Sequence, residues 1–109
     1  MAQDFESTFA HSIKSGSFTD LLASNSDDAV IGIRFANLHS GSVTVDAKIT
    51  RSSVDFHLIK EAPIPAGGSL ELIDGGSKVV MMNGDVLKAQ ASMTGSVDAI
   101  VSFIDSISE

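Results

Sequence analysis

Residues 29–49, AVIGIRFANLHSGSVTVDAKI, contain two runs in which apolar and polar residues alternate. A period of two is typical of a half-buried β-strand, because successive side chains point to opposite faces of the sheet. The apolar faces consist of Ile31, Ile33 and Phe35 in the first run and Val43, Val45, Ala47 and Ile49 in the second. Residues 39–42, HSGS, have the flexible polar character of a turn, so the stretch predicts a β-hairpin.

The rest of the chain repeats this pattern between clear turn signals. Residues 61–69 hold two prolines and a Gly-Gly pair, residues 74–76 read DGG and residues 83–85 read NGD. Strands are therefore predicted at residues 18–23, 29–38, 42–51, 54–60, 69–73, 78–82, 86–93 and 97–107. Short strands separated by frequent turns predict an all-β domain, a two-layer antiparallel β-sandwich of jelly-roll-like form with about seven or eight strands.

Two packed layers would bury one face of each strand. The predicted inward set is Ile31, Ile33, Phe35, Val43, Val45, Ile49, Phe56, Leu58, Leu70, Leu72, Val86, Val101 and Phe103. The last strand also carries apolar residues on its second face, at Ile100 and Ile104. We expect this second face to contact another chain or the N-terminal segment.

The N-terminal segment has a different pattern. Phe5, Phe9 and Ile13 recur every four residues, a spacing that places them on one face of a short helix. We therefore predict an N-terminal arm or short helix at residues 1–17, followed by the β-sandwich domain at residues 18–109.

Composition narrows the function classes. A chain of 109 residues has the usual size of one domain, and without cysteine it has neither disulfides nor thiolate metal sites. Fourteen acidic and seven basic residues give a formal net charge of −7, which disfavours binding to nucleic acid. No apolar run approaches the roughly 20 residues of a membrane helix, and the N-terminus does not resemble a secretion signal. We expect synthesis in a cytoplasm and no contact with a membrane.

The three histidines do not predict a metal site. His11, His39 and His57 lie in different predicted elements, and none has a second ligand at helical or alternating spacing. We interpret them as surface histidines.

One turn is rich in oxygen donors. Asp27 and Asp28 follow residues 24–26, SNS, and such a turn is able to hold a calcium ion. It lacks the glycine and the terminal glutamate of an EF-hand loop, so a polar turn is the favoured interpretation. The glycine pairs at residues 67–68 and 75–76 precede no helix and no GK[ST] motif, and we interpret them as turn formers.

No arrangement typical of an enzyme is found. The chain has no GxSxG motif, and Asp46 and Asp55, which could face each other across paired strands, would need a cleft and a raised pKa. Met81 and Met82 are expected to fill gaps in the core. We predict no catalytic, cofactor-binding or metal-binding residue, and we do not expect an enzyme.

Several longer motifs carry a family resemblance. They are the AN pair at 36–37, VTVD at 43–46, HLIKEAPIPAGGSLEL at 57–72 and NGDVLKAQAS at 83–92. In these motifs and their order, residues 29–106 resemble small β-sandwich virion proteins of tailed bacteriophages. The resemblance implies a virion structural protein that is located in the virus particle and works by contact.

Within a particle, the leading hypothesis is a capsid decoration, or cement, protein that bridges major capsid subunits. The N-terminal arm would dock it through four apolar anchors, Phe5, Phe9, Ile13 and Phe18. The expected partners are the major capsid protein or other virion proteins, together with further copies of the chain, with a trimer as the expected homo-oligomer.

Two alternatives remain open. The first is a neck, tail or fibre-associated adaptor of the virion, which would be present in far fewer copies. The second is a glycan-binding β-sandwich module, which would use loops 24–28 and 63–69 at one end of the sandwich. The absence of Trp and Tyr disfavours the glycan module.

Overall fold

The computed structural model describes residues 4–11, 13–24, 26–93 and 95–105, and within them it contains strands and turns but no helix. For Asp4 and for residues 73–78 the description covers the backbone only. The strands are β1 (Asp4–Ala10), β2 (Thr19–Ala23), β3 (Asp28–Asn37), β4 (Val43–Arg51), β5 (Val54–Ile64), β6 (Ser69–Met81), β7 (Val86–Ala91) and β8 (Val97–Asp105).

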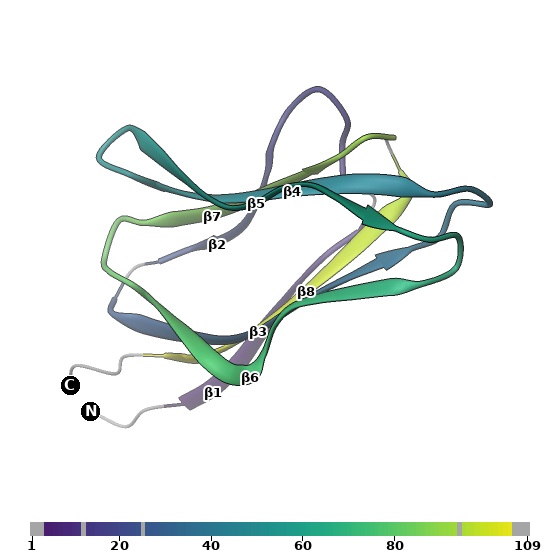
Figure 1. Cartoon of the computed structure of the whole chain (residues 1–109). Coiled ribbons are helices and arrows are strands. Elements are labelled where there is room, and N and C mark those ends of the chain that lie inside the picture. The colour runs from purple at the N-terminus through teal and green to yellow at the C-terminus, as the bar shows by residue number, and fades with distance from the viewer. Residues whose placement is uncertain (1–3, 12, 25, 94, 106–109) are drawn as a thin grey trace.

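These strands form two packed layers (Figure 1). Sheet I has the order β1-β8-β3-β6, sheet II has the order β2-β7-β4-β5, and all neighbouring strands are antiparallel. The chain crosses from one sheet to the other at every connection except the one between β4 and β5. Eight strands in this arrangement form a jelly roll, which confirms the predicted all-β sandwich.

The hairpin predicted at residues 29–49 is wrong: both of its strands are present, but they do not pair with each other. β3 pairs with β6 and β8, whereas β4 pairs with β5 and β7, so residues 38–42 cross between the sheets. The buried side chain of Asn37 holds this crossing. Its Nδ2 donates to the carbonyl oxygens of Gly41 (2.9 Å) and Ile64 (3.1 Å), and its Oδ1 accepts from the backbone N–H of His39 (2.8 Å). A polar turn suits a hairpin and a crossing equally well, which is why local pattern does not identify a strand's partner.

The hairpin that does form between consecutive strands joins β4 to β5. Its two turn residues, Ser52 and Ser53, have φ of 52° and 65°. Two successive positive φ values are typical of the type I′ turn, whose backbone twist matches that of the flanking strands. Serine has a Cβ that disfavours this conformation, so the turn is held by the pairing on either side of it.

The core lies between the two sheets, and much of the predicted inward set is found there. The buried members are Ile33, Phe35, Val43, Val45, Ile49, Val101 and Phe103. Ile31, Leu58, Leu70, Leu72 and Val86 are only half-buried, and Phe56 is 57% exposed. For Ile31 the reason is a register shift between Val30 and Gly32, which places Val30 in the core and Ile31 outside it. Val86 lies on the outer face because β7 buries the alternate set that begins with Leu87.

The two strands β5 and β6 are longer than predicted, and both lie at sheet edges. β5 continues through Pro63, which pairs opposite Thr44; an edge strand tolerates proline because one of its sides makes no ladder hydrogen bonds. The turn predicted at residues 74–76 is instead a bulged part of β6, where residues 75–78 lie opposite the single residue Ile31. Met81 fills the core as predicted, whereas Met82 is exposed.

The separate arm or short helix predicted at residues 1–17 is corrected by the structure. Residues 4–10 form β1, which pairs along its length with β8 and so belongs to the sandwich. The spacing of four between Phe5 and Phe9 fits a strand as well as a helix, because it is also a multiple of two.

Candidate interaction sites

The structure divides the four predicted anchors into two groups. Phe5 and Phe9 are 78% and 73% exposed, whereas Ile13 is fully buried in the core. Phe18 is half-buried, and its ring lies under the Lys48 ammonium, with Nζ 3.8 Å from the ring centroid. Of the four predicted anchors, only Phe5 and Phe9 are therefore available as large apolar contacts.

The alternation of β1 exposes this pair. Thr8 and Ala10 face inward, and the Thr8 hydroxyl donates to the carbonyl oxygen of Leu21 at 2.9 Å. Phe5 and Phe9 point the other way, to the outer face of sheet I. There Phe5 lies opposite Ile104 and Phe9 opposite Ile100. The apolar second face of the last strand thus lies beside the N-terminal segment, one of the two partners expected for it from the sequence. Beyond Phe9, the row ends in a hydrogen bond between His11 Nδ1 and Asp98 Oδ1 at 2.7 Å.

Ile13 lies in the crossing from β1 to β2. Its backbone N–H donates to the carbonyl oxygen of Val97 (2.9 Å), and its own carbonyl oxygen accepts from Gly95 (3.2 Å). The next carbonyl oxygen, that of Lys14, accepts from the backbone N–H of Ala91 (3.1 Å). These bonds tie the crossing to both sheets and push the Ile13 side chain between them. Ile13 therefore closes one end of the core and is not a docking residue.

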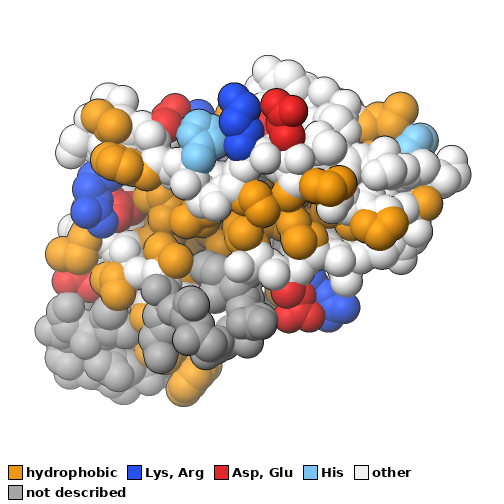
Figure 2. Space-filling model, viewed as in Figure 1, with side chains coloured by type: hydrophobic (Ala, Val, Ile, Leu, Met, Phe, Trp, Pro, Cys, Tyr) orange, Lys and Arg blue, Asp and Glu red, His pale blue; other side chains and the backbone are white. Residues whose placement is uncertain are grey.

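A second apolar surface lies where the sandwich is open, and the sequence pattern alone did not reveal it. Apolar side chains form a row between the two layers on the side of β5 and β6 (Figure 2). At one end of this row a recess of about 270 Å³ is lined by Ile49, Arg51, Phe56, His57, Leu58 and Val79. Leu58, Leu70, Leu72 and Val79 contact the core yet remain partly exposed here, since β5 and β6 end their sheets. The signal that could have revealed it is the apolar face of strands that also carry edge markers such as Pro63.

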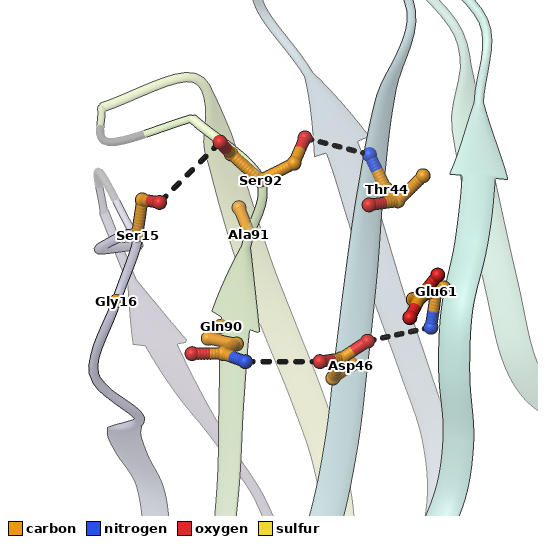
Figure 3. Close-up of a pocket in the computed structure, with 8 residues that line it drawn as sticks. All are labelled: Ser15, Gly16, Thr44, Asp46, Glu61, Gln90, Ala91 and Ser92. Carbon is orange, nitrogen blue, oxygen red and sulfur yellow. Dashed lines mark hydrogen bonds between the residues drawn. The ribbon is translucent and has the colours of Figure 1, made fainter.

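In a small pocket on the outer face of sheet II, polar groups of the lining residues hydrogen-bond to one another (Figure 3). Asp46 accepts from Gln90 Nε2 at 2.9 Å and from the backbone N–H of Glu61, which lies in a bulge with φ of 52°. Ser92 Oγ accepts from the backbone N–H of Thr44 at 3.0 Å. These side chains hold β7, β4 and β5 together, so the pocket has a structural explanation.

The candidate carboxylates do not converge. Asp46 is engaged as described above, whereas Asp55 accepts from Lys48 Nζ and Thr50 Oγ1, each at 2.7 Å. The Lys48 and Thr50 hydrogen bonds hold the pKa of Asp55 below its usual range. The two aspartates therefore stabilise separate parts of sheet II and form no acid–base pair.

The oxygen-rich turn is organised around Asp28, which is almost fully buried. Its Oδ2 accepts from Ser24 Oγ at 2.8 Å and its Oδ1 lies 2.9 Å from Ser26 Oγ, which also lies 3.0 Å from Asp105 Oδ1. Hydroxyl groups thus occupy both oxygens of Asp28, as expected for a polar turn. Among the residues that the structure describes, no three His, Asp or Glu side chains are grouped closely enough to hold a metal ion.

An ion pair between the half-exposed Arg51 and the buried Asp85 holds the C-terminal end of β4. Arg51 donates through Nη2 to Asp85 Oδ2 at 2.6 Å and through Nε to Asp85 Oδ1 at 2.9 Å. Asp85 also accepts from the backbone N–H of Met82 at 2.9 Å. The Arg51 hydrogen bonds, helped by the Met82 N–H, hold the pKa of Asp85 below its usual range despite its burial.

The loops expected to form a glycan site lie at opposite ends of the molecule. Residues 24–28 precede β3, while Asn37 at the end of β3 donates to the carbonyl oxygens of Ile64 and Pro65 in the other loop. The full length of a ten-residue strand separates them. The expectation that they share one end is therefore wrong. No helix in the described part of the chain has the length and hydropathy to span a membrane.

No protein-family model matches this chain, and no curated protein matches it. Among solved structures, its fold is similar to a chain in the structure of infectious bursal disease virus Gx strain, with a TM-score of 0.56 at 9% identity. The similarity covers 100% of this chain and 34% of that chain. In the infectious bursal disease virus VP2 subviral particle, the TM-score is 0.53 at 12% identity, over 95% of this chain and 33% of that one.

The fold is also similar to a chain of Bacillus endospore appendages, described as disulfide-linked pili. The TM-score is 0.54 at 12% identity, and the match covers 98% of this chain and 88% of that one. This chain thus spans about one third of the viral chains and most of the appendage chain. At such low identities these comparisons establish the fold alone, which is similar to chains of infectious bursal disease virus and of Bacillus endospore appendages.

Proposed function

We propose that this chain is a structural protein of a virion, which works by binding its neighbours in a protein shell and catalyses no reaction. The observation that carries the proposal is the eight-stranded jelly-roll fold, which is similar over 95% or more of the chain to chains of infectious bursal disease virus. The resemblance of residues 29–106 to virion proteins of tailed phages points the same way. The exposed Phe5 and Phe9 give such a protein contact area that a solitary domain does not need.

More specifically, we propose a decoration protein that binds the outer surface of a capsid and bridges major capsid subunits. A compact acidic sandwich bound across a seam adds apolar burial and edge-strand hydrogen bonds there, and so opposes opening of the shell. The chain offers two kinds of contact for this purpose: sheet edges at β1, β5 and β6, and apolar side chains beside them.

The test is the number of copies in purified particles. Quantitative mass spectrometry against the major capsid protein should find the chain in hundreds of copies. About six or twelve copies would favour a neck, tail or fibre-associated adaptor, which is also a virion structural role. Absence from particles would refute the virion proposal.

A second candidate, a subunit of a surface fibre, is favoured by one specific observation. The match to the Bacillus appendage chain covers nearly the whole of both chains. Because this chain has no cysteine, its subunits would associate without disulfides. Long regular filaments from the purified chain in negative-stain electron microscopy would support this candidate, and their absence would remove it.

The glycan-binding module is the least supported alternative. Its two loops lie far apart, and the polar groups of the pocket in Figure 3 are hydrogen-bonded within the protein. Binding to any member of a glycan array that is lost on mutation of Ser92 or Gln90 would revive it.

A further inference from the structure

We propose that Asn83, in the turn between β6 and β7, is a site of spontaneous deamidation, and that the hydrogen bond from the backbone N–H of Gly84 to Ser24 controls the rate. Such a reaction modifies the chain covalently without an enzyme. It depends on this chain alone and is independent of the proposed virion role.

The reaction needs only the chain and water. Asparagine is one of the thermolabile residues of proteins. The backbone nitrogen of Gly84 loses its proton to solvent and attacks the side-chain carbonyl carbon of Asn83, which closes a five-membered succinimide ring. The bond from that carbon to the side-chain nitrogen breaks, and ammonia leaves. Water then opens the ring at either carbonyl, so that an aspartate or an isoaspartate remains at position 83.

The turn presents both reacting groups to solvent. Residues 82–85 form a β-turn, closed by a hydrogen bond of 3.0 Å from the Asp85 N–H to the carbonyl oxygen of Met82. Gly84 has φ of 96°, as the third residue of a type II turn requires. Asn83 and Gly84 are both exposed, and no atom outside residues 83–85 lies within 4 Å of the position that a Cβ of residue 84 would take. The attack on Asn83 is therefore unhindered by neighbouring side chains.

The surrounding structure restrains the attacking nitrogen. The Gly84 N–H donates to the carbonyl oxygen of Ser24 at 2.9 Å, and the Ser24 N–H donates to the carbonyl oxygen of Asp85 at 2.8 Å. Ser24 is itself buried, with its Oγ 2.8 Å from Asp28 Oδ2. Because the nitrogen of Gly84 must lose its proton and turn toward Asn83, these bonds have to open first. The rate should therefore follow local opening between residues 24–28 and 82–85.

Asn37 provides a comparison within the same chain. Its side chain is 2% exposed, its Nδ2 donates to the carbonyl oxygen of Ile64 and its Oδ1 accepts from the N–H of His39. The residue that follows it is Leu38, whose side chain crowds the attacking nitrogen. We therefore expect no deamidation at Asn37 while the chain is folded.

Deamidation should weaken this end of the sandwich. An isoaspartate adds one carbon to the backbone before Gly84, which shifts the Gly84 N–H away from the carbonyl oxygen of Ser24. Either product also adds a negative charge two residues from Asp85, whose carboxylate is bound by Arg51 at 2.6 Å. The modified chain should unfold at a lower urea concentration than the unmodified chain.

Incubation of the folded chain at mildly alkaline pH tests the proposal. Peptide mapping by mass spectrometry gives the deamidated fraction at each asparagine, and the same measurement in concentrated urea gives the rate without the fold. Ser24→Ala removes the hydroxyl that fixes Ser24 to Asp28. Ser42→Ala is the matched control, because its hydroxyl lies 3.3 Å from the carbonyl oxygen of Ile64 at the opposite end of β3. Circular dichroism first establishes that each variant is folded.

We expect deamidation at Asn83 in the folded chain, roughly tenfold or more slower than in urea, and a higher rate in Ser24→Ala than in wild type or Ser42→Ala. A folded chain that stays unmodified at Asn83, after many half-lives of the reaction in urea, would overturn the modification site. Equal rates with and without urea, or a Ser24→Ala variant that reacts no faster than Ser42→Ala, would overturn the control by Ser24.

Discussion

The sharpest prediction separates two residues that the sequence placed in the same group of anchors. Ile13→Ala removes three carbon atoms from a fully buried side chain, which corresponds to roughly 2.4 kcal/mol of lost transfer free energy. The space left behind adds about 1 to 2 kcal/mol, because the hydrogen bonds of Ile13 to Val97 and Gly95 keep the backbone from collapsing into it. We therefore expect the free energy of unfolding to fall by about 3 to 4 kcal/mol.

Phe9→Ala is the matched comparison, since it removes a larger side chain from a neighbouring position. Phe9 is 73% exposed and loses mainly its cross-strand contact with Ile100, worth at most about 1 kcal/mol. Urea denaturation followed by circular dichroism measures both changes, and Ile13→Val, at about 1 kcal/mol, provides an intermediate point. If Ile13→Ala cost less than about 1 kcal/mol, or no more than Phe9→Ala, the placement of Ile13 in the core would be refuted.

Three further predictions concern the turns and the ion pair. Replacing Ser52 and Ser53 by Asn and Gly should raise the free energy of unfolding by about 1 kcal/mol, because these residues adopt positive φ with less strain; an unchanged urea midpoint would contradict the turn assignment. Asn37→Ala should lower the free energy of unfolding by about 2 to 4 kcal/mol, because the carbonyl oxygens of Gly41, Ile64 and Pro65 lose their donor. A loss near zero in the same urea assay would show that water replaces the amide. The pKa of Asp85 is lowered in the folded state by Arg51, so its contribution is complete above the unfolded pKa of about 3.9 and is lost as the pH falls through the folded pKa. The stability difference between wild type and Asp85→Asn should therefore shrink in acid, and a difference that stays constant with pH would contradict this assignment.

Removal of residues 1–17 would not be a neutral truncation. It would delete β1 and with it the strand that covers one edge of β8, and it would take Ile13 out of the core. A docking role for the N-terminal segment is therefore better tested by changing Phe5 and Phe9 alone. Both side chains point away from the core, so their loss leaves the packing between the sheets intact.

The positions of most strands follow from the sequence because alternation is a local property. The runs that contain Ile33, Phe35, Val43 and Val45 each place one apolar face inward in the structure, as predicted. Alternation fails where an extra residue enters a strand. At Ile31 a bulge reverses the faces, and only the pairing of β3 with β6 and β8 reveals it.

The candidate sites were less accessible to prediction. Phe5 and Phe9 could be identified as unusual in sequence, but the same pattern also included Ile13, and the difference between them is a matter of hydrogen bonds to distant strands. The recess beside Phe56 could not be predicted, because it forms between the edge strands of two packed sheets. Its two walls, β5 and β6, belong to different sheets, and only the packing of one sheet on the other brings them together.

By itself the sequence determined what depends on neighbouring residues: the two-residue period that makes the chain a β protein, the absence of cysteine, the acidic charge and some of the turns, such as the one at residues 83–85. The tertiary structure alone decided which strands pair, which edges stay open and which apolar residues remain in contact with solvent. The physical reason is that burial is a property of the whole packed sandwich. Ile13, in a crossing, is buried because hydrogen bonds of the crossing at Ile13 and Lys14 hold it against both sheets, while a phenylalanine in a regular strand is left outside by the direction in which its Cβ points.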